Sequence, residues 1–367
     1  MTASRGLASV AVVGLAVGLT VALAPIAVAE TAPAGEKVVT VQDPRVSESS
    51  GLVASPTHDG LVWTVNDSGH TASVFGVSLR SGRTVAVLRL RDTDARDWES
   101  MAAGRLADGR GVLWIGDTGD NSGTRESIVL RLVREPEQLP DDGRAVDVTP
   151  VSLRVRYPDG PHDVEALVLT QDGRLLLVTK ELFAGTIYQV PPEAVRSALA
   201  GTSVTTPVTA RDVGGVKQSL VTDGTTLPDG RVVLRGYVDA SIYADRTRSD
   251  RGFEQQSTFR LPPQQQGETV TAVDGGAALL VGSEGVRQPL WRVPLGSSAQ
   301  GEATPASRQT TNAAGAPTSA TTGSSSTRSG TGVDREAGRS HDVLVWVLRL
   351  AALALIPVAF AAGRRRR

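Results

Sequence analysis

The sequence predicts an all-β fold, a closed β-propeller of five blades, and two observations support this prediction. Short runs rich in Val, Ile, Thr and Leu alternate with turns such as Asp-Gly and Gly-Gly, while helical periodicity is nearly absent. In addition, an acidic residue precedes a short apolar run five times, at intervals of 51, 66, 58 and 45 residues, which is typical of repeat folds with loop insertions. These residues are Glu48, Glu99, Glu165, Asp223 and Glu268. A β-sandwich is the structural rival, but it would not predict the recurrence.

Grouping the expected strands in fours assigns the blades in chain order. The first four blades span approximately residues 51–89, 98–157, 164–213 and 220–261. The fifth blade has only three strands of its own, within 268–294, and an N-terminal strand at 37–42 supplies the fourth and closes the ring without exposed edges. Six blades are the alternative, if 135–160 or 240–262 holds an extra one. The helix expected at 192–200 begins with proline and is followed by a glycine.

The N-terminal segment differs in composition from the predicted propeller domain, residues 30–295. Residues 1–29 have the pattern of a secretory signal peptide, with Arg5 before an apolar run and small residues at Ala27 and Ala29 for cleavage. The sequence therefore predicts an exported protein.

The C-terminal segment predicts a membrane anchor. Residues 296–341 are rich in Ser, Thr, Gly and Ala and are expected to form a disordered tether. Residues 342–363 are an apolar stretch long enough to span a bilayer as a helix. The basic tail 364–367 is expected in the cytoplasm by the positive-inside rule. The protein is thus expected in the cell membrane as a single-pass protein with its propeller extracellular.

Composition excludes several kinds of function. The 367-residue chain has no cysteine, so disulfides and thiolate metal sites are excluded. Its formal net charge of −1 does not indicate a basic surface for binding nucleic acid. The partners expected are the membrane, through the C-terminal helix, and a cell-wall polymer or small-molecule ligand.

Polar residues are expected to converge on one face of the propeller. The second strand of a blade is antiparallel to the first and returns to the face where the first begins, so side chains at these two positions meet. The residues at the start of first strands are Glu48, Asp97, Glu99, Asp163, Glu165, Asp223 and Glu268. The residues at the end of second strands are Asn66, Asp67, Asp117, Asp120, Asn121, Lys180, Glu181, Arg235 and Glu284.

This convergence predicts a cation site. Crowded carboxylates raise one another's pKa unless cations neutralise them, and Lys180 and Arg235 offset only two charges. Oxygen ligands favour calcium, and Gly119 is expected to allow a sharp turn between two of them. The expected metal ligands are Asp97, Asp117, Asp120 and Asn121. The expected catalytic residues are Glu99, Glu165, Lys180 and Arg235. The expected ligand-binding residues are Glu48, Asn66, Asp67, Asp223, Glu268 and Glu284.

Each of these residues also has a structural interpretation. Asn66-Asp67 and Asp120-Asn121 are common turn formers that cap their own backbone. Lys180 and Arg235 can equally form structural ion pairs in the channel wall. Both interpretations remain open at the level of the sequence.

Several short motifs resemble a group of exported actinobacterial β-propeller proteins with no settled activity. The motifs are Asp97-Trp98-Glu99, Gly116-Asp117-x-Gly119-Asp120-Asn121 with Arg125 following, Glu135-Pro136, Thr179-Lys180-Glu181 and Glu284-Gly285. The group is distantly similar to calcium-dependent propeller hydrolases such as phytase-like esterases and gluconolactonases. The resemblance therefore implies the propeller fold and export, and it leaves the reaction open.

Two functions follow as expectations. The first is a cell-surface propeller with an acidic ligand site, associated with a divalent cation, on one face. The second is a metal-dependent hydrolase of phosphate esters, carboxylic esters or lactones, with Glu99 or Glu165 as general base and Lys180 or Arg235 stabilising negative charge. The sequence contains no recognisable dedicated nucleophile, so whether the protein is an enzyme stays open.

Overall fold

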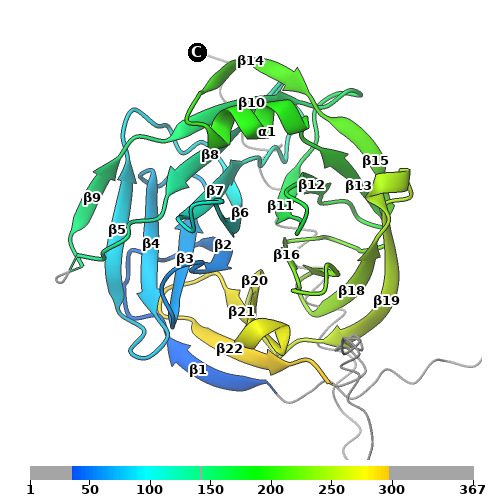
Figure 1. Cartoon of the computed structure of the whole chain (residues 1–367). Helices are drawn as coiled ribbons and strands as arrows, with labels where there is room; N and C mark the ends of the chain where they lie inside the picture. Colours follow the sequence, from blue (N-terminus) through cyan, green and yellow to red (C-terminus); the bar gives the residue numbers. More distant parts are fainter. Residues whose placement is uncertain (1–34, 141–142, 297–367) are drawn as a thin grey trace, which may run out of the picture. The chain divides into compact units, whose positions relative to one another are not determined.

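Five sheets surround a central axis, which confirms the five-bladed propeller (Figure 1). The computed structural model describes residues 35–140 and 143–296. Blade I contains β2 (Ser49–Ala54), β3 (Leu61–Asn66), β4 (Ser73–Ser78) and β5 (Thr84–Leu90). Blade II contains β6 (Trp98–Arg105), β7 (Gly111–Asp117), β8 (Ile128–Arg134) and β10 (Val151–Arg156). Blade III contains β11 (Val164–Leu169), β12 (Leu175–Thr179), β13 (Gly185–Gln189) and β15 (Arg211–Val216).

The last two blades close the ring. Blade IV contains β16 (Asp223–Thr226), β17 (Val232–Arg235), β18 (Asp239–Asp245) and β19 (Phe253–Arg260). Blade V contains β20 (Gly267–Val273), β21 (Ala278–Ser283), β22 (Pro289–Pro294) and β1 (Glu36–Thr40). The pairing of β1 with β22 is antiparallel, so the N-terminal strand completes blade V as predicted. The six-blade alternative is wrong, because 135–160 and 240–262 contribute strands to blades I, II and IV only.

Two strands cross from one blade to its neighbour, which the sequence did not predict. The chain leaves blade II after β8, adds β9 (Ala145–Val148) parallel to β5 of blade I, and then returns as β10. It repeats this pattern after β13, adding β14 (Val204–Thr209) parallel to β10 of blade II before it returns as β15. The outer edges of blades I and II are thereby covered by strands from the next blade.

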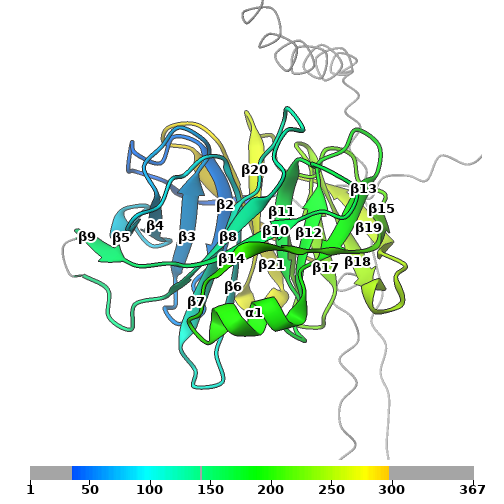
Figure 2. The ribbon, with the colours of Figure 1, turned by 90° about the horizontal axis from the view of Figure 1, so that it is seen from above.

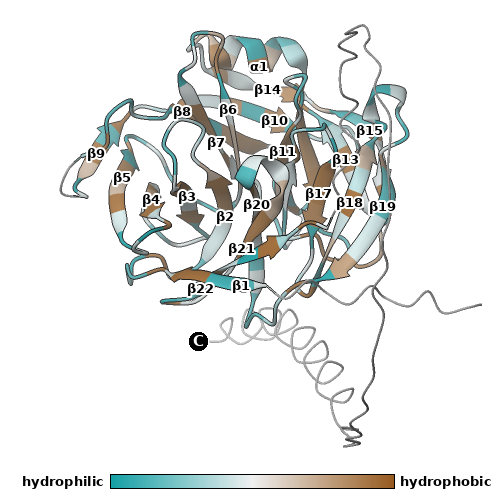
Figure 3. Ribbon diagram, turned by 60° about the horizontal axis from the view of Figure 1, so that its bottom comes forward, coloured by the Kyte–Doolittle hydropathy of each residue, from teal (hydrophilic) through white to brown (hydrophobic). Residues whose placement is uncertain are grey.

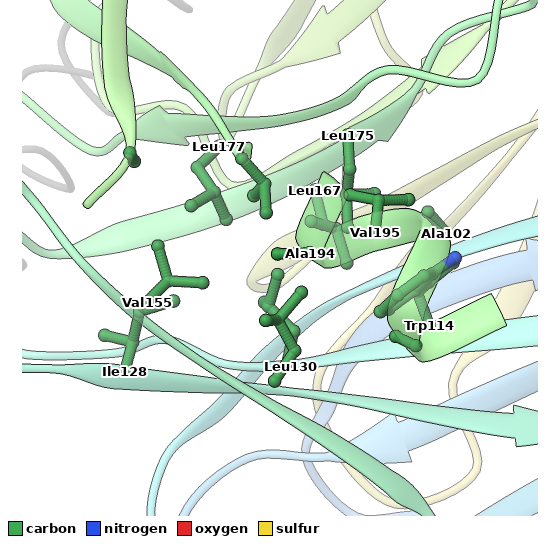
Figure 4. Packing of buried hydrophobic residues seen from close by; sticks show 14 of the residues in the cluster. Ala102, Trp114, Ile128, Leu130, Val155, Leu167, Leu175, Leu177, Ala194 and Val195 are labelled. Carbon is green, nitrogen blue, oxygen red and sulfur yellow. The ribbon is translucent and has the colours of Figure 1, made fainter. Parts of the chain in front are cut away.

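The helix α1 (Pro192–Leu199) lies between β13 and β14, as expected from its proline start. Its apolar side buries Ala194 and Val195 against a cluster that includes Trp114 and Leu175 (Figure 4). Seen from the side, α1 lies along one face of the ring (Figure 2). This is the face at which the first strand of each blade ends.

Continuous apolar strands form the core between blades. Strands β3, β7 and β12 are buried along their whole length, because each is covered by a neighbouring blade on both sides. Hydrophobic residues concentrate on strands such as β7, β11 and β17 (Figure 3). The first strands β2, β6, β11, β16 and β20 contact one another in sequence around the axis. Their beginnings therefore meet at one mouth of the central channel.

In residues 35–140 and 143–296, no helix is both long and apolar enough to cross a bilayer. The predicted signal peptide 1–29 and the predicted membrane span 342–363 lie outside the described residues, as do nearly all of the predicted tether and the basic tail.

Candidate functional site

Four of the five first strands carry a β-bulge at the same place, next to the channel mouth. The register shifts fall between Ser49 and Gly51, Trp98 and Ser100, Val164 and Ala166, and Gly267 and Thr269. A bulge leaves one residue unpaired and redirects its side chain. The bulged residues are Ser50, Glu99, Glu165 and Glu268.

The bulges correct the expected ring of five acids. Glu99, Glu165 and Glu268 are equivalent, one in each of blades II, III and V. The blade I equivalent is Ser50, and Glu48 lies two residues earlier on the rim, 3.3 Å from His70. Blade IV has no bulge, because Asp223 pairs with Arg235 in regular register.

Asp67, Asp97 and Glu99 form an acidic triad at the mouth. One carboxylate oxygen from each lies within 4.8 Å of the others, so the triad can hold a metal ion. Gly119 leaves the space for it, because a Cβ at this position would lie 2.5 Å from Asp97 Oδ2 and 2.7 Å from Glu99 Oε1. Its φ is outside the left-handed region, so Gly119 provides space here and does not provide the sharp turn that we expected.

Two of the triad carboxylates, Asp97 and Glu99, have a raised pKa. Burial, followed by the charges of Asp67 and Asp163, raises the pKa of Asp97 to about 7. Burial, followed by the charges of Glu165, Asp67 and Asp97, raises the pKa of Glu99 well above its usual range. Glu99 is almost fully buried, and no hydrogen bond to its carboxylate occurs in the described part of the chain. A bound cation would offset this repulsion.

Lys180 supplies the positive charge beside the triad. Its ammonium group forms an ion pair with Glu165 and lies 5.3 Å from the centre of the Tyr237 ring. Burial acts to lower the pKa of Lys180, but Glu165, Tyr237 and Glu268 outweigh it, so the net shift is upward and the lysine stays charged. Sequence reasoning missed Tyr237, although it follows Arg235 by only two positions.

Glu268 and Glu284 complete the mouth on the blade V side. Burial raises the pKa of Glu268, against the effect of Lys180 and Arg235. Burial, followed by the charges of Glu268, Asp67 and Glu48, raises the pKa of Glu284 to about 8. Gln266 donates a 2.6 Å hydrogen bond to Glu284. Glu268 and Glu284 therefore lie at the same acidic mouth, close enough for Glu268 to raise the pKa of Glu284.

Arg235 forms hydrogen bonds with backbone groups of two blades beneath the mouth. It is fully buried, and its guanidinium donates to the carbonyls of Gly236, Thr269 and Gly282 at 3.0 to 3.1 Å, as well as to the side chain of Gln264. Burial lowers the pKa of Arg235 to about 10. These contacts join blades IV and V, so they support the structural interpretation of Arg235 over the catalytic one.

Two of the predicted ligand-binding residues form hydrogen bonds with backbone groups instead. The fully buried Asp223 accepts hydrogen bonds from the N–H groups of Gly224 and Val270, both at 2.8 Å, which fastens β16 to β20. Asn66 donates to the Arg45 carbonyl at 2.6 Å and accepts from the N–H groups of Ser47 and Glu48.

Three of the four predicted metal ligands do not belong to the triad. Asp117 forms a buried 2.7 Å ion pair with Arg125, and Asp120 accepts the Arg125 N–H at 2.7 Å. Arg125 also donates to the Gly119 carbonyl at 2.7 Å, so this loop folds around the arginine. Asn121 is exposed. Of the predicted set, only Asp97 belongs to the triad.

Two cavities among the described residues lie at the opposite end of the first strands. One, of about 210 Å³, is lined by residues such as Ala54, Ala102 and Thr225. The other, of about 470 Å³, is lined by Trp114 and by Val195 of α1. The charged groups therefore lie at one mouth of the channel, and these two cavities lie toward the other end.

No known protein family matches this chain, and no curated protein does. Among solved structures it is similar to U3-55K, with 11% identity over 71% of this chain and 100% of that chain and a TM-score of 0.38. It is also similar to the PQQ-bound aldose sugar dehydrogenase from Streptomyces coelicolor, with 12% identity over 72% and 99% of the two chains and a TM-score of 0.40. The glutaminyl cyclase from Myxococcus xanthus has 12% identity over 72% and 97%, with a TM-score of 0.37. Similarity at this level carries no inference about activity, so the site is interpreted from its own residues.

Proposed function

We propose that this propeller binds a divalent cation between Asp67, Asp97 and Glu99, and that the acidic mouth around the ion is a ligand site. The observation that carries the proposal is the triad itself, in which residues of two blades bring three carboxylate oxygens within 4.8 Å of one another. Carboxylates at this separation are stable only when protons or a cation neutralise them. The missing side chain at Gly119 preserves the space that the ion needs.

Calcium is the cation that fits best. All three ligands are carboxylates, and calcium prefers hard oxygen ligands in irregular six- to eight-fold coordination that waters and carbonyl groups complete. Zinc and copper favour sulfur or imidazole, and neither group belongs to the triad.

Calcium binding is tested on the full-length chain after removal of metal with EDTA. Titration with CaCl₂ is followed by calorimetry and by melting temperature, because a ligand that binds only the folded state raises the melting temperature. Asp97→Asn is expected to abolish the shift. Glu126→Gln, which alters an exposed acid on the loop that carries Gly119, is the matched control and is expected to retain it.

If neither calorimetry nor melting detects calcium, and magnesium and manganese give the same result, the triad is not a cation site. A shift that survives in Asp97→Asn would place the ion elsewhere. Either result would leave the fold intact and the function open.

A metal-dependent hydrolase is the second candidate, and the Lys180–Glu165 pair favours it. A divalent ion, when bound, would polarise a phosphoryl or acyl oxygen. Lys180 would stabilise developing negative charge, because it stays charged beside the triad. Glu165 would act as general base only if substrate binding separated it from Lys180.

The hydrolase candidate is tested with phosphate esters, carboxylic esters and lactones in the presence of calcium. Turnover that disappears in Glu165→Gln and in Lys180→Gln, with calcium binding retained, would support it. The absence of turnover on the whole panel, with calcium bound, would leave the ligand-binding function.

We also propose that the propeller is displayed outside the cell by the predicted span 342–363. The apolar stretch and the arginine tail of the sequence support this. The accessible ligands there would be a cell-wall polymer or a small molecule. Protease treatment of intact cells tests it, because an extracellular propeller is degraded and a cytoplasmic one is protected.

A further inference from the structure

Exposed apolar side chains gather on the same face as the acidic mouth. Within the described ranges, six large hydrophobic residues are exposed, and four of them lie in loops between the second and third strands of a blade. These four are Leu182 (59%), Phe183 (83%), Val238 (50%) and Val286 (49%). Because second strands end at the acidic face, the loops that carry all four residues lie on that face, in blades III, IV and V. Exposed apolar groups that share one face of a protein are typical of interaction sites.

One connector holds the apolar loops of blades III and IV in place. Ser219 donates a 2.6 Å hydrogen bond to the Leu182 carbonyl, and Leu220 donates its N–H to the Glu181 carbonyl at 2.8 Å. On the other side of the connector, Gln218 donates to Asp239 at 3.1 Å, directly after the Val238 loop. The two loops are therefore fixed relative to each other before any partner binds, which lowers the entropic cost of binding.

Leu220 adds a strained residue to this surface. Its φ of 48° lies in the left-handed region, which β- and γ-branched side chains seldom adopt. It is partly exposed between the two apolar loops. Glycine would adopt this conformation without strain. Leucine therefore lowers the stability of the fold at this position, and a contact between its side chain and a partner would explain its presence.

The charges around the apolar loops select the partner. Carboxylates outnumber cations at the mouth and on the adjoining rim. The carboxylates are Glu48, Asp67, Asp97, Glu99, Asp163, Glu165, Glu181, Glu268 and Glu284, and the cations are Lys180, Lys217, Arg235 and Arg287. Of these cations, Lys180 is paired with Glu165 and Arg235 is buried in the wall. By formal charge the carboxylates are in excess, and those with a raised pKa, such as Asp97 and Glu284, regain their charge when a cationic group binds beside them.

We propose that the acidic mouth and the apolar loops form one docking surface for a polypeptide segment that carries lysine or arginine among apolar side chains. The basic side chains enter the mouth toward Glu284 and Glu268, and the apolar side chains pack on Phe183, Leu182, Leu220 and Val238. An anionic lipid surface fits less well, because the exposed acids would repel it. This partner is additional to the cation, since none of the apolar residues belongs to the triad.

The test measures binding of a fluorescent peptide of alternating leucine and lysine to the full-length chain, in one detergent for all samples. Phe183→Ser and Glu284→Gln are each expected to weaken binding roughly tenfold. Val146→Ser is the matched control, because Val146 is an exposed valine on β9 at the outer edge of blade I, and it is expected to bind as the wild type does. Leu220→Gly is expected to weaken binding while the melting temperature stays the same or rises.

The outcomes separate this proposal from its rivals. Equal binding by wild type, Phe183→Ser and Glu284→Gln would overturn it. So would equal binding of a peptide in which glutamate replaces lysine. Calcium-dependent sedimentation with phosphatidylglycerol vesicles that is lost in Phe183→Ser, without peptide binding, would assign the surface to a membrane and overturn it as well. Calcium binding by Phe183→Ser is measured in parallel and is expected to be unchanged, so failure here is distinguishable from failure of the cation site.

Discussion

Replacing Glu99 with glutamine is expected to stabilise the metal-free protein and to weaken cation binding at the same time. Glu99 is buried beside Asp67 and Asp97, and it accepts no hydrogen bond in the described residues, although the charge of Lys180 acts to lower its pKa. Glutamine keeps the size of the side chain and removes the charge. A gain in the stability of the metal-free protein together with a loss of cation affinity is expected if the Glu99 carboxylate is a ligand of the cation.

The size of the stabilisation follows from two limits at pH 8. If Glu99 stays ionised, two unit charges 4.8 Å apart repel by roughly 3.5 kcal/mol at an effective dielectric constant of about 20. If Glu99 is protonated instead, holding the proton at pH 8 costs about 5 kcal/mol relative to an ordinary glutamate. The folded chain adopts whichever of these two states has the lower free energy. Asp67 and Asp97 are partly exposed, so solvent screens their charges and reduces the repulsion further. We therefore expect a gain of about 2 kcal/mol, or about 4 to 8 °C in melting temperature.

The pH dependence checks the same reasoning. Because the pKa of Glu99 is raised in the folded state, the folded chain binds more protons than the unfolded chain above the ordinary glutamate pKa. The metal-free wild type must therefore lose stability as pH rises from about 4.5 to 8, and Glu99→Gln must lose less. Melting curves in EDTA at several pH values measure both slopes. A lower melting temperature for Glu99→Gln than for the wild type at pH 8 would refute the repulsion argument.

Three further predictions concern neighbouring features. Gly119→Ala should reduce calcium affinity at least roughly tenfold by calorimetry with little change in circular dichroism, because its Cβ would lie 2.5 Å from Asp97; unchanged affinity would mean that the triad does not need this space. Calcium affinity should fall as pH drops through about 7, since the raised pKa of Asp97 lets protons compete with the ion; calorimetry at pH 6 and pH 8 should differ accordingly. Glu135→Ala should cost about 3 kcal/mol by urea denaturation, because the buried Glu135 accepts hydrogen bonds from Ser55, Thr57 and, at 2.6 Å, Trp63; a loss no larger than that of Glu135→Gln would contradict this role.

The repeat could be predicted from the sequence because each blade begins with the same succession of an acidic residue, an apolar run and a turn. The first strands and the closure of blade V by 37–42 follow from this succession alone. The crossing strands β9 and β14 could not be predicted. They pair in parallel with strands that precede them by many residues, and nothing local in a four-residue run such as Ala145–Val148 specifies a distant edge.

The sequence named the three residues of the triad, but it did not group them as the ligands of one cation. A bulge shifts the register by one residue, and the sequence does not mark which residue of Glu48-Ser49-Ser50 it will leave unpaired. The grouping of Asp97 with Glu99 and Asp67 depends on that register. The contribution of Arg125 depends on how a ten-residue loop closes on itself, which composition does not determine.

Hydrogen-bond donors separate the structural carboxylates from the functional ones. Asp223 and Asp120 each accept two or more backbone N–H groups, and Asp117 is held by Arg125, so these charges are already satisfied. Glu99 receives no such donor in the described part of the chain, although it is equally buried. Burying a carboxylate without a donor is costly unless something from outside the chain completes it. A buried acid that receives no hydrogen bond from the described chain, beside a glycine that keeps the space open, has the arrangement that a cation requires.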